Sequence, residues 1–202
     1  MKKYLLILFF IGIAFNGFSQ FEVKAFLGLN GASYSGLTEG ESQNAGLGFQ
    51  GGAAILFGTT WYFEPGIVWY TNGTDLNILA DSIISGENII SGFKVPLMVG
   101  YRFFGRTENL LNLRLFVGAT ANFVSKIKFG DIELNKDLYN SVNWDANFGV
   151  GLDIWFLYLE LGYELGLSDV YTGNISLKQN ALYANLGFRI RFGNKSRGRS
   201  KK

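Results

Sequence analysis

The chain has 202 residues, with 18 lysines and arginines, 16 aspartates and glutamates, no histidine and no cysteine. The missing cysteines exclude a disulfide framework and a thiolate metal site, and the missing histidines exclude Ser–His catalysis and the commonest metal ligand. The 27 glycines and 19 phenylalanines, against only 2 prolines, are unlike a disordered chain and are typical of many strands joined by tight turns.

The N-terminal segment has the pattern of a secretory signal peptide. Two lysines precede an apolar run over residues 4–15, and small residues stand at Gly17 and Ser19, the third and first places before a cleavage site. A membrane-spanning helix needs about 20 apolar residues, so this run is too short to be one. We therefore predict a cleaved signal peptide over residues 1–19, and the absence of cysteine excludes a lipoprotein anchor.

Eight later stretches alternate apolar and polar residues with the period of two that indicates β-strands. They cover Phe21–Asn30, Gly46–Phe57, Trp61–Thr71, Ile90–Phe103, Leu111–Val124, Asn143–Ile154, Leu157–Leu167 and Asn180–Phe192. The connections alternate between short turns and long polar loops, which is typical of a bacterial outer-membrane barrel with both termini at the periplasmic end. We predict an all-β fold, an eight-stranded antiparallel up-and-down transmembrane barrel over residues 20–193.

The two faces of these stretches differ in polarity. One face carries large apolar side chains in rows free of charge, and the other carries glycines and charged residues. The charged residues are Lys24, Glu64, Lys94, Arg102, Arg114, Asp145, Asp153, Glu160, Glu164, Arg189 and Arg191. Glycine weakens an exposed strand but suits a narrow lumen, and the six basic and five acidic groups nearly cancel, as a buried ion-pair network requires. We predict that the apolar rows face lipid and that the charges form a structural network in the lumen.

The length of the apolar rows agrees with this orientation. Phe93 and Phe103 are ten residue steps apart, and steps of ~3.4 Å at a tilt of ~45° cover roughly 24 Å. The apolar band of an outer-membrane barrel is about 25 Å tall, and aromatic residues at the ends of the rows suit its two girdles. Pro65 and Pro96 fall inside the stretches, where we predict a bulge at each, with a register error as the alternative.

Three carboxylates, Asp153, Glu160 and Glu164, are the strongest catalytic candidates. Glu160 and Glu164 stand four residues apart on one stretch, so their Cα atoms are roughly 13–14 Å apart, too far for the separation of about 5–9.5 Å in glycosidases. Asp153 could approach Glu160 across the tight turn, but Arg189 and Arg191 are equally close candidates for both. We expect lumen salt bridges instead, and no catalytic residue, metal or cofactor.

The chain resembles the small outer-membrane β-barrel proteins of the Bacteroidota, the PorT-like group. The resemblance lies in the signal ending GFSQ, the first strand and turn KAFLGLNGASYSG and the closing strand YANLGFRIRF. It covers essentially the whole predicted mature chain and implies an eight-stranded barrel in the outer membrane. Some relatives take part in a protein-secretion system of that phylum. A departure is the tail after Phe192, because many such barrels end on the aromatic residue that the assembly machinery reads.

Residues 194–202 form a basic tail that we predict to be disordered and periplasmic. Without this tail and the signal peptide, the body has 11 basic and 16 acidic residues, so the basic overall balance predicts no nucleic-acid surface. We predict a monomer whose partners are outer-membrane lipid, the barrel-assembly machinery, which would read the last strand, and a secretion or surface protein.

Three function classes remain open on the sequence. The first is a non-enzymatic structural or interaction protein that works through extracellular loops. The second is a narrow porin-like channel, which would need a water path between the basic and acidic groups of the lumen. The third is a secreted, soluble, lipocalin-like binding barrel, which would require the two faces to be inverted.

Overall fold

The computed structural model describes residues 21–35, 42–80, 82–104, 111–129, 132–133, 140, 142–169 and 178–192. The predicted signal peptide and the predicted basic tail lie outside the described residues, so both stay predictions. Among the residues described, no helix is long and apolar enough to cross a membrane.

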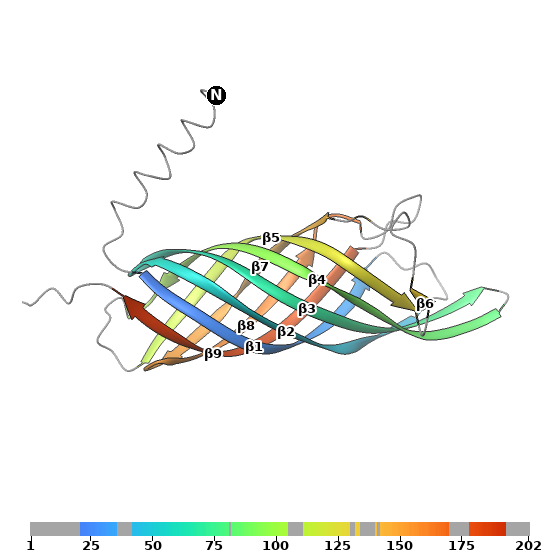
Figure 1. Cartoon of the computed structure of the whole chain (residues 1–202), viewed down its shortest axis with the longest axis horizontal. Coiled ribbons are helices and arrows are strands. Elements are labelled where there is room, and N and C mark those ends of the chain that lie inside the picture. The colour runs from blue at the N-terminus through green and yellow to red at the C-terminus, as the bar shows by residue number, and fades with distance from the viewer. Residues whose placement is uncertain are drawn as a thin grey trace, which may run out of the picture.

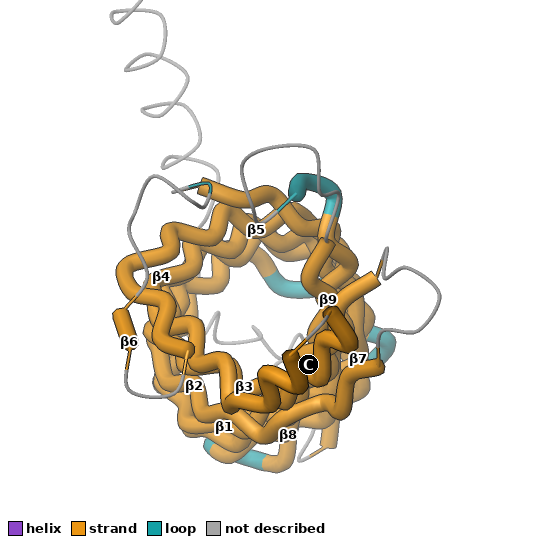
Figure 2. The backbone as a smooth tube through the Cα atoms, turned by 90° about the vertical axis from the view of Figure 1, so that its right-hand side faces the viewer, coloured by secondary structure: helices purple, strands orange, loops and turns teal. Residues whose placement is uncertain are grey.

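Eight long antiparallel strands close into a barrel (Figures 1 and 2). They are β1 (Phe21–Ser35), β2 (Ser42–Gly58), β3 (Trp61–Ala80), β4 (Ser82–Arg102), β5 (Leu111–Phe129), β7 (Val142–Ile154), β8 (Leu157–Gly166) and β9 (Lys178–Phe192), while the two-residue strand β6 (Ile132–Glu133) pairs with β5. Long strands that follow one another in the chain are neighbours in the sheet, and the pairing of β1 with β9 completes the ring. The predicted eight-stranded up-and-down barrel is confirmed.

The first residue of β1 and the last residue of β9 meet at one end of the barrel, which we call the terminal end. Phe21 pairs with Phe192, and their rings stack with centroids 5.0 Å apart. The β2–β3 and β7–β8 turns lie at the same end, and each uses a residue of positive φ, Gly58 (φ 113°) and Trp155 (φ 56°). Such left-handed backbone allows a tight turn to match the twist of the strands that it joins.

The β3–β4 hairpin runs well beyond the alternating stretches. The predicted stretches end at Thr71 and begin again at Ile90, with a long polar loop over residues 72–88 between them. That loop is wrong, because the two strands stay paired as far as Ala80 and Ser82. A ladder is held by backbone hydrogen bonds, which do not require the apolar alternation that lipid imposes on the membrane-facing rows. In Figure 1 this hairpin projects from the end opposite to the terminal end. β1, β2 and β5 are also longer there than predicted.

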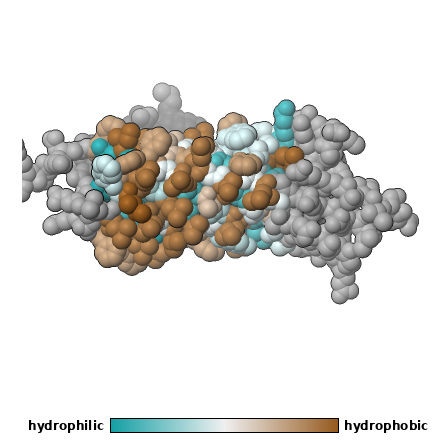
Figure 3. Space-filling view, turned by 90° about the horizontal axis from the view of Figure 1, so that it is seen from below, coloured by the Kyte–Doolittle hydropathy of each residue, from teal (hydrophilic) through white to brown (hydrophobic). Residues whose placement is uncertain are grey.

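The outer surface of the barrel is apolar and its interior is charged. Leu27 and Leu47 are 76% and 77% exposed, whereas Lys24 and Arg114 are each 1% exposed. On the face shown in Figure 3, apolar residues gather over the half of the barrel nearer the terminal end. The prediction that the apolar rows face outward is confirmed.

Aromatic side chains border this apolar surface at two levels. Trp69 pairs with Phe93, and Phe93 pairs with Phe123, which places three exposed rings in a row across β3, β4 and β5. At the terminal end, the rings of Trp61 and Tyr101 pack edge to face with centroids 5.0 Å apart. Two aromatic levels with an apolar surface between them are the arrangement that a membrane barrel presents to its two interfaces.

Each proline lies in a gap of one of the two ladders that β3 makes. Between β3 and β4, pairing passes from Pro65 with Leu97 to Val68 with Lys94 without a change of register, and Pro96 lies within this gap. Between β2 and β3, pairing passes from Ala54 with Gly66 to Phe57 with Phe63, again in register, and Pro65 lies within that gap. The predicted bulge at each proline is therefore wrong, and so is a register error. Each proline lacks a single N–H donor, so an interruption of one ladder at its own position accommodates it without an inserted residue.

Candidate functional site: the charged lumen

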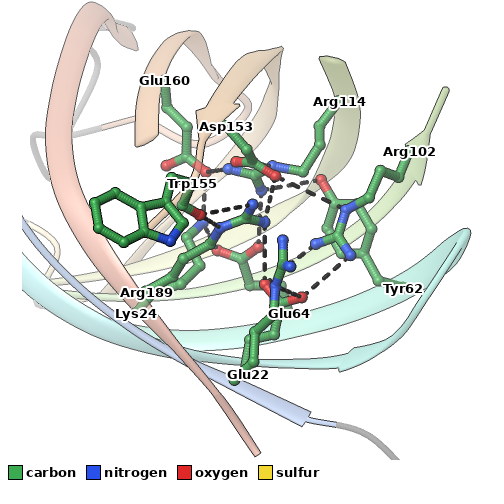
Figure 4. Close-up of polar contacts among 11 residues, drawn as sticks. Glu22, Lys24, Tyr62, Glu64, Arg102, Arg114, Asp153, Trp155, Glu160 and Arg189 are labelled. Atoms are coloured by element: carbon green, nitrogen blue, oxygen red, sulfur yellow. Dashed lines mark hydrogen bonds and ion pairs between the residues drawn. The ribbon is translucent and has the colours of Figure 1, made fainter. Parts of the chain in front are cut away.

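Charged side chains fill the interior of the barrel near the terminal end (Figure 4). We call this group the ion-pair plug; its members are Glu22, Lys24, Glu64, Arg102, Arg114, Asp153, Glu160, Arg189 and Arg191. They come from β1, β3, β4, β5, β7, β8 and β9, so they meet across the lumen from almost every side. All of them except Arg191 are buried.

Arg114 on β5 is the centre of the plug. Its Nε lies 2.8 Å from Asp153 Oδ1, and its Nη2 lies 2.8 Å from Glu160 Oε1. A third carboxylate, that of Glu64, is 3.5 Å from Nη1. Because a guanidinium presents its donors in a fixed planar fork, this one arginine joins β5 to β3, β7 and β8.

Lys24 on β1 binds two of the same carboxylates. Its Nζ lies 2.5 Å from Glu64 Oε1 and 2.5 Å from Glu160 Oε1. The ammonium also lies 4.4 Å from the ring centroid of Tyr158, a distance that suits a cation–π contact. Glu64 and Glu160 therefore share the two cations Lys24 and Arg114, and the Tyr158 ring covers the Lys24 ammonium.

Glu22 on β1 gathers three arginines at the terminal edge of the plug. Its carboxylate oxygens lie 3.2 Å from Arg102 Nη1, 3.3 Å from Arg189 Nη1 and 3.2 Å from Arg191 Nε. Arg189 also lies 2.6 Å from Asp153 Oδ2. Asp153 and Glu22 thus share their arginines, which makes the plug one continuous network.

Sequence reasoning missed Glu22 and the tyrosines of the lumen. Glu22 stands two residues before Lys24, so the two-residue period places both on the inner face. The same two-residue spacing relates Tyr62 to Glu64. In both cases the spacing from a predicted lumen charge is the sequence signal that places the residue on the inner face. The buried tyrosines of the inner face are Tyr62, Tyr70, Tyr158 and Tyr183.

A smaller polar group surrounds Lys94 farther from the terminal end. Lys94 Nζ lies 2.5 Å from Glu164 Oε2 and 4.5 Å from the ring centroid of Tyr70. Asn122 donates a hydrogen bond to the carboxylate of Asp145. We call this group the upper cluster; its members, all buried, are Lys94, Asn122, Asp145, Asn147 and Glu164.

A small cavity with apolar and polar walls lies between the plug and the upper cluster. Phe26, Met98 and Phe116 line a cavity of about 50 Å³, with Glu160 of the plug and Lys94 of the upper cluster also in its wall. One water molecule needs about 10–15 Å³, so the cavity has room for a few groups the size of water.

The eleven charged residues predicted for the lumen lie in two separate groups. Lys94, Asp145 and Glu164 belong to the upper cluster, and the other eight belong to the plug. With Glu22, the two groups together hold six basic and six acidic residues. Of the three catalytic candidates, Asp153 and Glu160 are both bound by Arg114, and Glu164 is bound by Lys94. In the part of the chain that the structure describes, no three acidic residues are grouped so that they could hold a metal ion.

A closed barrel with an apolar outer surface, two aromatic levels and a charged, paired interior is an integral outer-membrane protein. The chain belongs to the family described as outer membrane protein beta-barrel domain, which matches residues 14–172. Its location is therefore the bacterial outer membrane. No curated protein sequence matches the chain.

Two solved outer-membrane barrels are similar to it in fold. The outer membrane protein OprG from Pseudomonas aeruginosa aligns with a TM-score of 0.57 and 14% identity, covering 87% of this chain and 97% of that one. Neisserial surface protein A (NspA) aligns with a TM-score of 0.52 and 17% identity, covering 85% and 97%. At these identities the likeness concerns the fold alone.

Proposed function

We propose that the protein is a non-enzymatic outer-membrane barrel with a sealed lumen, and that it works by interaction at its extracellular end. The observation that carries this proposal is the ion-pair plug, whose side chains meet across the lumen at separations of 2.5–3.8 Å. Lys24, Arg102, Arg114 and Asp153 are each 0–1% exposed. Side chains that exclude solvent so completely interrupt a continuous water path along the lumen.

Opening the plug would be costly, which argues against the porin-like alternative. Removing one partner of a buried ion pair costs about 3–5 kcal/mol, and Arg114 alone engages three carboxylates. An eight-stranded barrel is also only wide enough for its own side chains. The soluble lipocalin-like alternative is disfavoured for a different reason, since it needs a polar outer surface and Leu27 and Trp61 are 76% and 69% exposed.

The β3–β4 hairpin supports interaction at the extracellular end. Short turns are periplasmic in such barrels and long connections are extracellular, so the end opposite to the terminal end faces outward. The hairpin continues past the aromatic pair Trp69 and Phe93 as far as Ala80 and Ser82. The resemblance to the PorT-like group supports a secretion-accessory role as the more specific form of this proposal.

Single-channel recording in planar lipid bilayers tests the sealed lumen. The purified barrel, shown to be folded by its faster migration on a gel without boiling, should give no conductance steps above the bare membrane. The matched variant replaces Lys24, Glu64, Arg114 and Glu160 with alanine, which removes two charges of each sign. If this variant folds, it should conduct. Regular openings from the wild-type protein would overturn the sealed lumen and favour the channel.

Shortening the β3–β4 hairpin tests the extracellular role. Leu76 lies opposite Gly86 in the ladder, so residues 77–85 can be replaced by Asn-Gly, a pair suited to a two-residue hairpin turn. The barrel should still fold and reach the outer membrane, while the amount of exported protein in the culture medium of the native host should fall. Unchanged export would contradict the secretion-accessory role.

A further inference from the structure

Among the described residues, Asp145 on β7 is the one buried carboxylate outside the ion pairs of the lumen. It is 5% exposed, and within the part of the chain described here its carboxylate has no ion-pair partner and accepts a hydrogen bond from Asn122. The other buried carboxylates all lie in ion pairs; they are Glu22, Glu64, Asp153, Glu160 and Glu164. A buried carboxylate is costly unless a positive charge accompanies it.

Oxygen acceptors without partners lie beside this carboxylate. Asn122 Oδ1 and Asn143 Oδ1 make no hydrogen bond among the described residues, and the two side chains are 8% and 5% exposed. Asn143 pairs with Asn122 across β5 and β7 and stands two residues from Asp145, on the same face. Carboxylate and amide oxygens are the ligands that hard cations prefer.

The distribution of charge along the lumen points in the same direction. The upper cluster holds Asp145 and Glu164 against Lys94, an excess of one negative charge, whereas the plug holds five basic and four acidic residues. One additional positive charge beside Asp145 would therefore neutralise the upper cluster locally.

We propose that the upper cluster and the adjacent Asn143 together bind one small monovalent cation, held by the carboxylate of Asp145 and the amide oxygens of Asn122 and Asn143. Glu164 adds to the negative potential at this position, while its own ion pair with Lys94 stays in place. The single unpaired charge of Asp145 calls for a monovalent cation, and three buried oxygen atoms can surround only a small one, such as sodium, potassium or ammonium. The site does not depend on the function proposed for the extracellular end.

Unfolding of the whole barrel in a non-ionic detergent tests the site. Thermal midpoints would be measured by heat-dependent gel migration in sodium, potassium, ammonium or N-methylglucamine chloride, at equal ionic strength and fixed pH. A bound cation stabilises the folded state by mass action, so at 100 times its Kd the folding constant rises about 100-fold. The wild-type midpoint should rise with the logarithm of the small-cation concentration, and N-methylglucamine should leave it unchanged.

Asp145→Asn keeps the shape of the side chain and removes its charge, so it should abolish this dependence on the small cation. Glu160→Gln is the matched control: it alters a paired carboxylate of the plug and should lower the midpoint while keeping the cation dependence. Broadening of the sodium-23 resonance by the wild-type barrel, reversed by potassium, needs no variant. Equal responses to sodium and N-methylglucamine, an unchanged dependence in Asp145→Asn, or a response to pH alone would each overturn the proposal.

Discussion

The ring of Tyr62 on β3 lies over Gly100, its ladder partner on β4. A Cβ atom at residue 100 would come closer than 3.0 Å to three atoms of this ring and its hydroxyl. Tyr62 is 2% exposed, and Arg114 Nη1 lies 3.4 Å from its hydroxyl oxygen. The same arrangement recurs where Tyr183 lies over Gly162 and where Tyr158 lies over Gly187. In this narrow barrel, the inward tyrosines occupy the space that glycines on the neighbouring strand leave open.

We therefore expect Gly100→Val to destabilise the barrel. The new side chain would displace the Tyr62 ring, and overpacking of this kind costs about 1–3 kcal/mol. Urea unfolding of the barrel refolded in lipid vesicles, followed by gel migration, measures the change. Gly31→Val is the control, because a Cβ at residue 31 has no atom within 4 Å. Equal losses in the two variants would show that the Tyr62–Gly100 contact is not the cause.

Replacing Arg114 with methionine should destabilise the barrel by about 3–5 kcal/mol, because it leaves buried carboxylates without a shared cation. Arg191→Met is the comparison, since the Arg191 side chain is 27% exposed and lies at the edge of the plug. That change should cost about 0–1 kcal/mol, as for a surface ion pair. Urea unfolding of both variants gives the two values, and similar losses would mean that burial does not set the strength of the network.

The pair of Lys94 and Glu164 should behave as a unit. Lys94→Met and Glu164→Gln each leave the other charge buried, which costs about 3–5 kcal/mol. The double variant should lose less than the sum of the two single losses, with a coupling energy of about 0.5–3 kcal/mol. A double-mutant cycle by urea unfolding measures this coupling. Additive losses would indicate that each residue interacts mainly with other neighbours.

The free-energy cost of a charge on the lipid-facing surface should depend on the depth of that charge in the membrane. Val117, 59% exposed, lies on β5 midway between Leu111 and Phe123 at the two ends of the apolar row. Val117→Arg should cost about 2–4 kcal/mol and Leu111→Arg about 0–1 kcal/mol, because an arginine near the interface reaches the headgroups. Unfolding in vesicles of one lipid gives both values. Comparable costs in the two variants would contradict a membrane whose midplane lies near Val117 and whose interface lies near Leu111.

The sequence predicts the orientation of the strands well and their ends poorly. In the row from Phe93 to Phe103, the alternation is strict because one face meets lipid and the other meets the lumen. Past Trp69 that requirement ends, so alternation no longer marks the paired hairpin up to Ala80. The bulge predicted at Pro65 is wrong for another reason. Whether a missing N–H donor produces a bulge or a gap in the ladder depends on the neighbouring strand.

The sequence by itself determines the class of fold and the face on which each side chain lies, because a period of two is local and needs no knowledge of pairing. Only the tertiary structure decides which charges meet. Closure of the barrel places β1 beside β9 and across the lumen from β5, so Glu22 gathers three arginines and Arg114 joins three carboxylates. The same closure leaves Asp145 hydrogen-bonded to the amide of Asn122 and outside the ion pairs of the described residues, because ion pairing in a lumen depends on the stagger of strands far apart in the chain.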